Sequence, residues 1–126
     1  MDYLNGMFSI ALWDNNKKKF FLFRDRLGIK PLHYCILDGT LLFGSEIKSI
    51  LKYPNFKKEI NFEALSHYFS FGYIPAPHTI YKNIKKLLPG HYIAYNNNEY
   101  TIKKYWDIKF DYSNEKSEDY YCEKLD

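Results

Sequence analysis

Histidine and cysteine side chains are the groups with which this sequence could bind a metal or attack a substrate. The four histidines are isolated, and no two of them lie four residues apart around a carboxylate, which argues against a metal site: His33, His67, His78 and His91. Cys35 and His33 occupy alternate positions of one apolar stretch, so a strand would place them on the same face. A working cysteine–histidine pair also needs an orienting third group. We therefore interpret Cys35 as a buried structural thiol, with the pair as the alternative.

A charged turn after the aromatic stretch 20–23 carries the best polar candidates, Arg24 and Asp25. Successive strand residues point to opposite faces, so we expect one of the two to point into the core. We interpret the pair as an ionic and hydrogen-bonded clamp that holds the turn. Gly28 would permit a backbone twist there, and Pro31 would fix φ before the next strand. Direct catalysis by this pair is the alternative.

Length and composition indicate one small domain with a core. The chain has 126 residues, of which 20% are aromatic, and aromatic side chains favour sheet. The net charge of +3 comes from scattered lysines and gives no electrostatic footprint for nucleic acid. No apolar run approaches the ~20 residues of a membrane span, and the start is no signal peptide. Cys35 and Cys122 form no disulfide framework, so we expect a cytoplasmic protein with no membrane partner.

Strands are predicted in three antiparallel pairs. The runs 7–13 and 20–23 flank a polar turn, and the runs 32–37 and 40–43 flank Asp38-Gly39, a strong hairpin signal. The runs 91–95 and 100–106 flank three asparagines. Because the run 7–13 is almost wholly apolar, it predicts a strand buried on both faces. Such a strand so close to residue 1 leads us to expect further chain upstream.

Two short helices are predicted between the second and third pairs. Ser45 is expected to cap the first, with Glu46 at its positive end and an inner face of Ile47, Ile50 and Leu51 before Pro54. The second is expected to begin at Asn61 and to end at Gly72, with an inner face of Phe62, Leu65 and Phe69. Ser117 is typical of the cap of one more helix near the end of the sequence.

Five blocks, at 7–14, 24–32, 43–48, 72–77 and 88–92, together resemble the motifs of glutamine-hydrolysing asparagine synthase, in order and at natural spacing. The block Arg-Asp-x-x-Gly-x-x-Pro-Leu at 24–32 is similar to class II glutamine amidotransferases in general. The resemblance implies an α+β fold: part of an N-terminal-nucleophile sandwich, mainly antiparallel strands with two short helices. It also implies that residues 1–106 are the C-terminal half of the amidotransferase domain, and that 107–126 are the linker and first helix of a synthetase domain.

The implied parent enzyme converts aspartate, glutamine and ATP into asparagine, glutamate, AMP and diphosphate, with Mg²⁺ as a further cofactor and a homodimer as one possible assembly. In the family a cysteine at the mature N-terminus attacks glutamine, and neither cysteine here matches it. We therefore expect no catalytic, cofactor-binding or metal-ligating residue in this chain, and no activity of the chain alone. The resemblance carries over scaffold positions instead: Arg24, Asp25, Gly28, Pro31, Ser45 and Glu46.

Two alternatives remain open at this stage. One is a non-catalytic interaction module that uses open sheet edges to bind a partner. The other is part of a related class II amidotransferase that delivers ammonia to a different acceptor.

Overall fold

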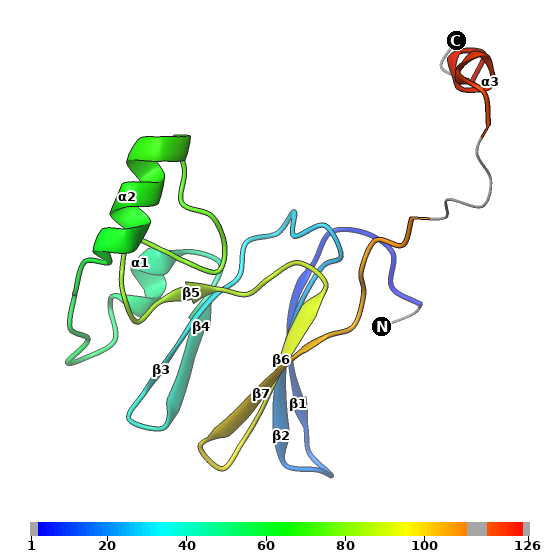
Figure 1. The fold of residues 1–126 in the computed structure, drawn as a ribbon. Helices are drawn as coiled ribbons and strands as arrows, with labels where there is room; N and C mark the ends of the chain where they lie inside the picture. Colours follow the sequence, from blue (N-terminus) through cyan, green and yellow to red (C-terminus); the bar gives the residue numbers. More distant parts are fainter. Residues whose placement is uncertain (1–2, 111–115, 125–126) are drawn as a thin grey trace.

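A computed structural model describes residues 3–110 and 116–124 of the chain (Figure 1). Over these residues the elements follow one another as β1 (Ser9–Asp14), β2 (Lys19–Arg24), β3 (His33–Leu37), β4 (Thr40–Gly44), α1 (Ile47–Ile50), α2 (Phe62–Phe71), β5 (Lys85–Lys86), β6 (His91–Asn96), β7 (Glu99–Lys104) and α3 (Glu118–Cys122). Residues 111–115, part of the predicted linker, lie outside the described residues.

The strands form two antiparallel sheets. One sheet has the order β1-β2-β6-β7 and the other has the order β4-β3-β5. The hairpins β1–β2, β3–β4 and β6–β7 turn at the same end of the molecule, and the longer connections gather at the opposite end (Figure 1). Mainly antiparallel strands with short helices confirm the predicted α+β class.

The main core lies between the two sheets. Leu22 of β2 and Ile93 of β6 are register partners with no exposed surface, and they pack with Tyr34 of β3. Leu32, which directly precedes β3, and Leu87, which directly follows β5, complete this cluster. Strand alternation sends Cys35, the next residue after Tyr34, to the other face of the small sheet, where it packs with Ile50 of α1.

The turn chemistry of two hairpins follows the sequence. Asp38 and Gly39 both have positive φ, at 47° and 74°, as the tight two-residue hairpin requires. Asn97 and Asn98 take the same conformation in the β6–β7 turn. Asparagine and aspartate tolerate this backbone better than other residues with a side chain, which is why these turns were predictable.

The predicted double burial of the first strand is wrong. β1 lies at the edge of its sheet, and the side chains of Leu12 and Trp13 are 47% and 55% exposed. Its apolar run is real, but Leu12 and Trp13 point to opposite faces, so the described residues cover both faces incompletely. The run therefore shows that the strand is rich in apolar residues, but it does not show what packs against them in this chain.

The cap of α1 also differs from the prediction. Glu46 occupies the N-cap position and makes no side-chain cap hydrogen bond, whereas Ser45 lies one residue earlier. The Ser49 hydroxyl donates instead to the Glu46 carbonyl oxygen at 2.6 Å. The predicted inner face is confirmed, because Ile50 is buried and Ile47 and Leu51 pack beside it.

The ends of α2 are as predicted, but its orientation is not. The Asn61 side chain caps the helix by accepting from the Ala64 amide, and Gly72 ends it with φ of 76°. The predicted inner residues Phe62 and Phe69 are 74% and 79% exposed, while Ala64 is fully buried. The small side chain of Ala64 thus faces the rest of the chain, and Leu65, the third predicted inner residue, is partly buried.

At the end of the chain, Ser117 caps α3 as predicted, by accepting a hydrogen bond from the Tyr120 amide. None of the described helices is long and apolar enough to cross a membrane.

Candidate functional site

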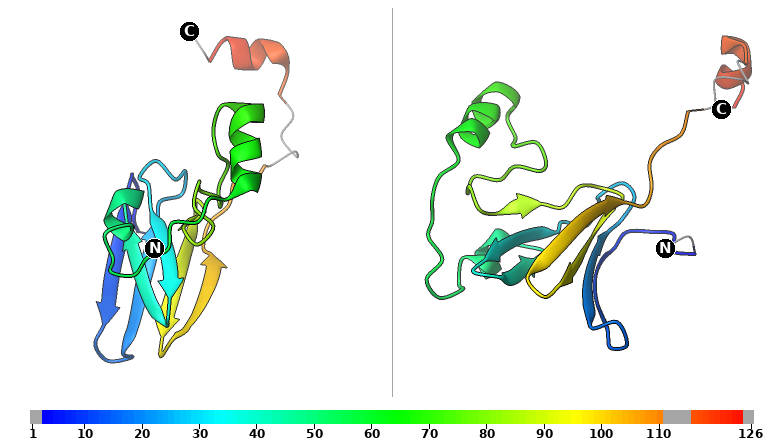
Figure 2. Two further views of the ribbon diagram at one scale, coloured as in Figure 1. Left: turned by 90° about the vertical axis from the view of Figure 1, so that its left-hand side faces the viewer. Right: turned by 60° about the horizontal axis from the view of Figure 1, so that its bottom comes forward.

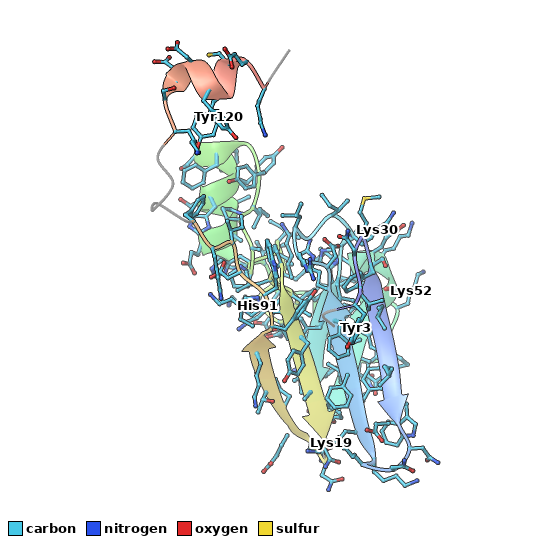
Figure 3. All side chains as sticks on the ribbon, turned by 90° about the vertical axis from the view of Figure 1, so that its right-hand side faces the viewer. Tyr3, Lys19, Lys30, Lys52, His91 and Tyr120 are labelled. Atoms are coloured by element: carbon cyan, nitrogen blue, oxygen red, sulfur yellow. The ribbon has the colours of Figure 1, made fainter. Side chains whose placement is uncertain are left out.

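The connection from β2 to β3 holds the motif with the most polar chemistry. It lies at the end of the large sheet opposite the hairpin turns, and Figure 3 shows Lys30 and Lys19 at these two ends. The turn is tight: the Gly28 amide donates to the Asp25 carbonyl at 3.2 Å, and Gly28 has φ of 69°. A Cβ atom on Gly28 would lie 2.7 Å from Cγ of Pro89, so a second turn presses against this position.

Asp25 is the buried member of the Arg24–Asp25 pair, with 1% of its surface exposed. Its carboxylate accepts from the Ile29 amide through Oδ1 and from the Lys30 amide through Oδ2, each at 2.9 Å. Its backbone amide donates to the Phe8 carbonyl, and its carbonyl accepts from the Gly90 amide. One residue thus joins the start of the chain, its own turn and the segment before β6.

The protonation of Asp25 is set by two opposed effects. Burial by itself raises the pKa of this carboxyl group, because it disfavours the charged form. The amide donors, led by Lys30 and Ile29, stabilise the anion and bring the pKa below its ordinary value. Asp25 is therefore a charged structural acceptor at neutral pH, not a poised general acid.

Arg24 closes the same turn from outside. Its guanidinium donates to three backbone carbonyls, of Lys30 at 3.0 Å, Gly28 at 2.8 Å and Leu87. Burial lowers the pKa of Arg24, and the charge of Asp25 opposes that shift. Within the described residues no ion-pair contact joins Arg24 to Asp25, so the clamp acts through backbone hydrogen bonds rather than the expected ionic pair.

A second turn and the exit from β7 complete the cluster. Gly90 has φ of 66°, and its carbonyl accepts from the amides of Tyr105 and Trp106. The Tyr105 hydroxyl donates to the Arg24 carbonyl at 2.6 Å. Sequence reasoning missed the roles of Tyr105 and Gly90 here. The residues Leu88-Pro89-Gly90, within the block at 88–92, are typical of a turn and gave a signal for Gly90. No local pattern links residue 105 to residue 24.

An apolar cavity of about 320 Å³ adjoins the turn. Met7, Leu27, Ile29 and Trp106 are among its lining residues, and the guanidinium of Arg26 lies 5.9 Å from the Trp106 ring. The polar groups of Arg24 and Asp25 are directed at the backbone, so the side chains that the turn offers outward are mainly apolar.

The other carried-over residues divide into two groups. Pro31 belongs to the turn, and its carbonyl lies 3.2 Å from the Ser9 hydroxyl that donates to it. Ser45 shares a surface hollow with Pro31, and its carbonyl oxygen lies 3.1 Å from Nδ1 of His33. Glu46 points away and pairs with Lys48 at the surface.

The cysteines and histidines form no reactive group in the described parts of the chain. Cys35 is 1% exposed, and burial raises the pKa of its thiol, which disfavours the nucleophilic thiolate. Burial lowers the pKa of its neighbour His33. His67 and His78, which are distant in sequence, bring their rings to 5.7 Å. Over the described residues, no three His, Cys, Asp or Glu side chains gather as metal ligands would.

Comparison with known protein families shows the class of this chain. A family profile described as "Glutamine amidotransferase domain" matches residues 1–106, which includes both sheets and the whole cluster around Asp25. The chain belongs to this family.

Several curated relatives of the chain are named asparagine synthetases. The chain is 39% identical over 110 residues to asparagine synthetase [glutamine-hydrolyzing] 3 of Bacillus subtilis (strain 168), covering 86% of this chain and 18% of the relative. It is 43% identical over 116 residues to asparagine synthetase [glutamine-hydrolyzing] 2 of the same organism, covering 86% of this chain and 16% of the relative. It is 34% identical over 111 residues to amidase chyE of Penicillium rubens, covering 87% and 16%. The chain thus spans about a fifth or less of these relatives.

Proposed function

We propose that this chain is part of a glutamine-hydrolysing asparagine synthase, which forms asparagine from aspartate and ATP with glutamine as nitrogen donor. The observation that carries the proposal is the identity of 39% and 43% to two asparagine synthetases across most of the chain. The Arg24–Asp25 turn lies within the matched domain, and its side chains bond to backbone groups, which fits a scaffold role.

Within the parent, residues 1–106 are the C-terminal half of the amidotransferase domain. The profile match ends at residue 106, and the Trp106 amide makes one of the last hydrogen bonds back to the body, to Gly90. Residues 107–126 are then the linker and the first helix of the synthetase domain. ATP and Mg²⁺ act in that domain, and the parent is a cytoplasmic enzyme.

The chain itself supplies support rather than reacting groups. Arg24, Asp25, Gly28 and Pro31 hold the turn, and Ser45 and Glu46 mark the start of α1. The buried thiol of Cys35 favours this assignment, because a nucleophile needs both access and an available thiolate. The catalytic cysteine and the glutamine-binding groups belong to the other half of the domain, which would also cover the exposed side chains of β1.

A second candidate function differs from the first in the molecule that accepts the ammonia. The relative from Penicillium rubens is named an amidase, and its similarity extends over 111 residues. A class II amidotransferase with an acceptor other than aspartate would share the same scaffold. The scaffold residues around Asp25 do not distinguish the two, since they contact backbone and not an acceptor.

Glutamine hydrolysis tests the proposed division of labour. The 126-residue chain and the whole gene product are each incubated with glutamine, and glutamate is measured. We expect glutamate from the whole product and none from the chain. Glutamate release by the chain alone, if abolished by Cys35→Ser, would contradict the scaffold role, and Cys122→Ser is the matched control.

A further inference from the structure

A cavity of about 270 Å³ lies where the small sheet meets the large one. In the right-hand view of Figure 2, β7 runs beside the small sheet. Tyr34 of β3 and Tyr100 of β7 line the cavity from the two sheets. Lys82 and Asn83, just before β5, and Lys85 within it add further polar walls. The cavity is therefore formed by the packing of this chain's own elements.

The polar side chains around the cavity can all donate hydrogen bonds. Lysine ammonium groups only donate, and tyrosine hydroxyls and asparagine amides can donate. Among the described residues that line the cavity there is no Asp or Glu. Glu59 lies 3.6 Å from Lys82, whereas Lys85 makes no ion pair in the described parts of the chain. The positive charge of this cavity is thus only partly balanced.

Tyr34 offers a buried hydroxyl to the cavity. Its ring belongs to the main core, and 6% of its surface is exposed. Over the described residues its hydroxyl makes no hydrogen bond, although it is not sealed from solvent, because Nδ1 of His67 is the one buried side-chain polar atom without a partner there. Burial, with a smaller effect of Tyr100, raises the pKa of Tyr34 to about 12. The hydroxyl therefore keeps its proton at neutral pH and can donate.

The strand edge beside the cavity adds a backbone donor. The Leu87 amide donates to the Leu32 carbonyl at 2.9 Å, and Tyr34 faces Lys85 in the same register. Hydrogen-bonded pairs recur at every second residue of an antiparallel ladder, so the next one would fall at Ile36. Its partner position precedes the start of β5. The Ile36 amide is therefore directed to an open edge, and Ile36 lines the cavity.

We propose that this cavity binds a phosphate group, with Lys85 and the Tyr34 hydroxyl as its main contacts. Lysine binds phosphate as a point charge, whereas the planar fork of arginine, which no residue of this lining supplies, matches a carboxylate. Several donors around one cavity suit an anion with several acceptor oxygens. The group belongs to a free phosphate ion or to a small phosphate ester, which share this chemistry. The inference does not depend on the proposed function.

Hydrogen exchange of the whole gene product with inorganic phosphate tests the site, with chloride at equal ionic strength as the reference. We expect peptides that cover residues 33–37 and 82–87 to exchange about threefold or more slowly at saturating phosphate. Lys85→Gln should raise the phosphate concentration for half protection about tenfold, because it removes the unpaired charge. Lys52→Gln removes an exposed lysine elsewhere and should leave that concentration unchanged. The amides of β2 and β6 report that each variant is folded.

Tyr34→Phe separates binding from stability. The lost hydroxyl makes no hydrogen bond within the described chain, so we expect an unchanged melting temperature without phosphate. With phosphate, half protection should need about tenfold more of it. A lower melting temperature without phosphate, or unchanged protection with it, would overturn the role of the hydroxyl.

The choice of anion tests the chemical class. Protection by AMP at lower concentrations than by inorganic phosphate, with none by adenosine, would assign the phosphate group to a nucleotide. Equal concentrations of the two would assign the free ion. Equal protection by acetate would refute a phosphate site. Exchange that phosphate leaves unchanged, or that it slows equally in Lys85→Gln, would overturn the proposal.

Discussion

Replacing Asp25 by asparagine tests the claim that its buried carboxylate holds the turn between β2 and β3. Asparagine has nearly the same shape, but it offers one acceptor oxygen where Asp25 uses two, for the amides of Ile29 and Lys30. Its NH₂ group would face one of these donors. Asp25→Asn therefore removes one hydrogen bond to a charged group, worth about 1.5–3 kcal/mol, and leaves a buried amide without an acceptor, at about 1–3 kcal/mol.

We expect Asp25→Asn to lower the free energy of unfolding by about 3–4 kcal/mol at pH 7, measured by urea denaturation with two independent probes. Asp38→Asn is the matched control, because Asp38 is exposed in a turn whose positive φ asparagine tolerates. A loss below about 1 kcal/mol, or an equal loss in the control, would refute the clamp.

The same pair of proteins gives a pH signature. The pKa of Asp25 is lower in the folded state than its ordinary value, so the carboxylate contributes stability above the unfolded-state pKa of about 3.9. That contribution is lost as the pH falls through the lower, folded-state value. The stability difference between the wild-type chain and Asp25→Asn should thus be constant from pH 7 to about 5 and shrink below pH 4. A difference that is unchanged at pH 3 would contradict this assignment.

Three further substitutions follow from the same contacts. Gly28→Ala should destabilise by about 2 kcal/mol or more in urea denaturation, because its φ is positive and the added Cβ meets Pro89; a loss within 0.5 kcal/mol would contradict the close approach. Tyr105→Phe should cost about 1 kcal/mol in the same assay through the lost hydrogen bond to the Arg24 carbonyl, and unchanged stability would count against that bond. His67→Leu should raise the melting temperature, since it removes a buried Nδ1 that lacks a hydrogen-bond partner in the described structure; a lower melting temperature would show that Nδ1 is satisfied.

Local backbone chemistry was the part of the fold that the sequence predicted well. The Asp38-Gly39 turn and the caps at Asn61, Gly72 and Ser117 depend on a few neighbouring residues, and the structure confirms each. Strand alternation also predicted that one of the two polar neighbours, Arg24 or Asp25, points inward. The structure shows that it is Asp25.

The direction of apolar faces was harder to predict. Periodicity identified the stripe of Phe62 and Phe69 on α2, but not whether the described body or something else packs against it. The run that forms β1 gave the same difficulty at Trp13. Both errors have one cause: an apolar pattern indicates that a face is covered, and it does not say by which part of the protein.

Long-range contacts at the site had no local signal. Tyr105 reaches the Arg24 carbonyl across 81 positions of sequence, and the Arg24 guanidinium reaches Leu87 across 63. These bonds depend on the pairing of β2 with β6, which brings the ends of the two strands together. Sheet order therefore decides the site, and spacing along the chain does not.

Transfer of labelled nitrogen tests the central claim most directly. The whole gene product is incubated with aspartate, ATP, Mg²⁺ and glutamine that carries ¹⁵N in its side-chain amide, and the products are analysed by mass spectrometry. The account predicts asparagine with ¹⁵N in its amide, together with equal amounts of glutamate and AMP. Glutamate without labelled asparagine would contradict it and would favour an acceptor other than aspartate.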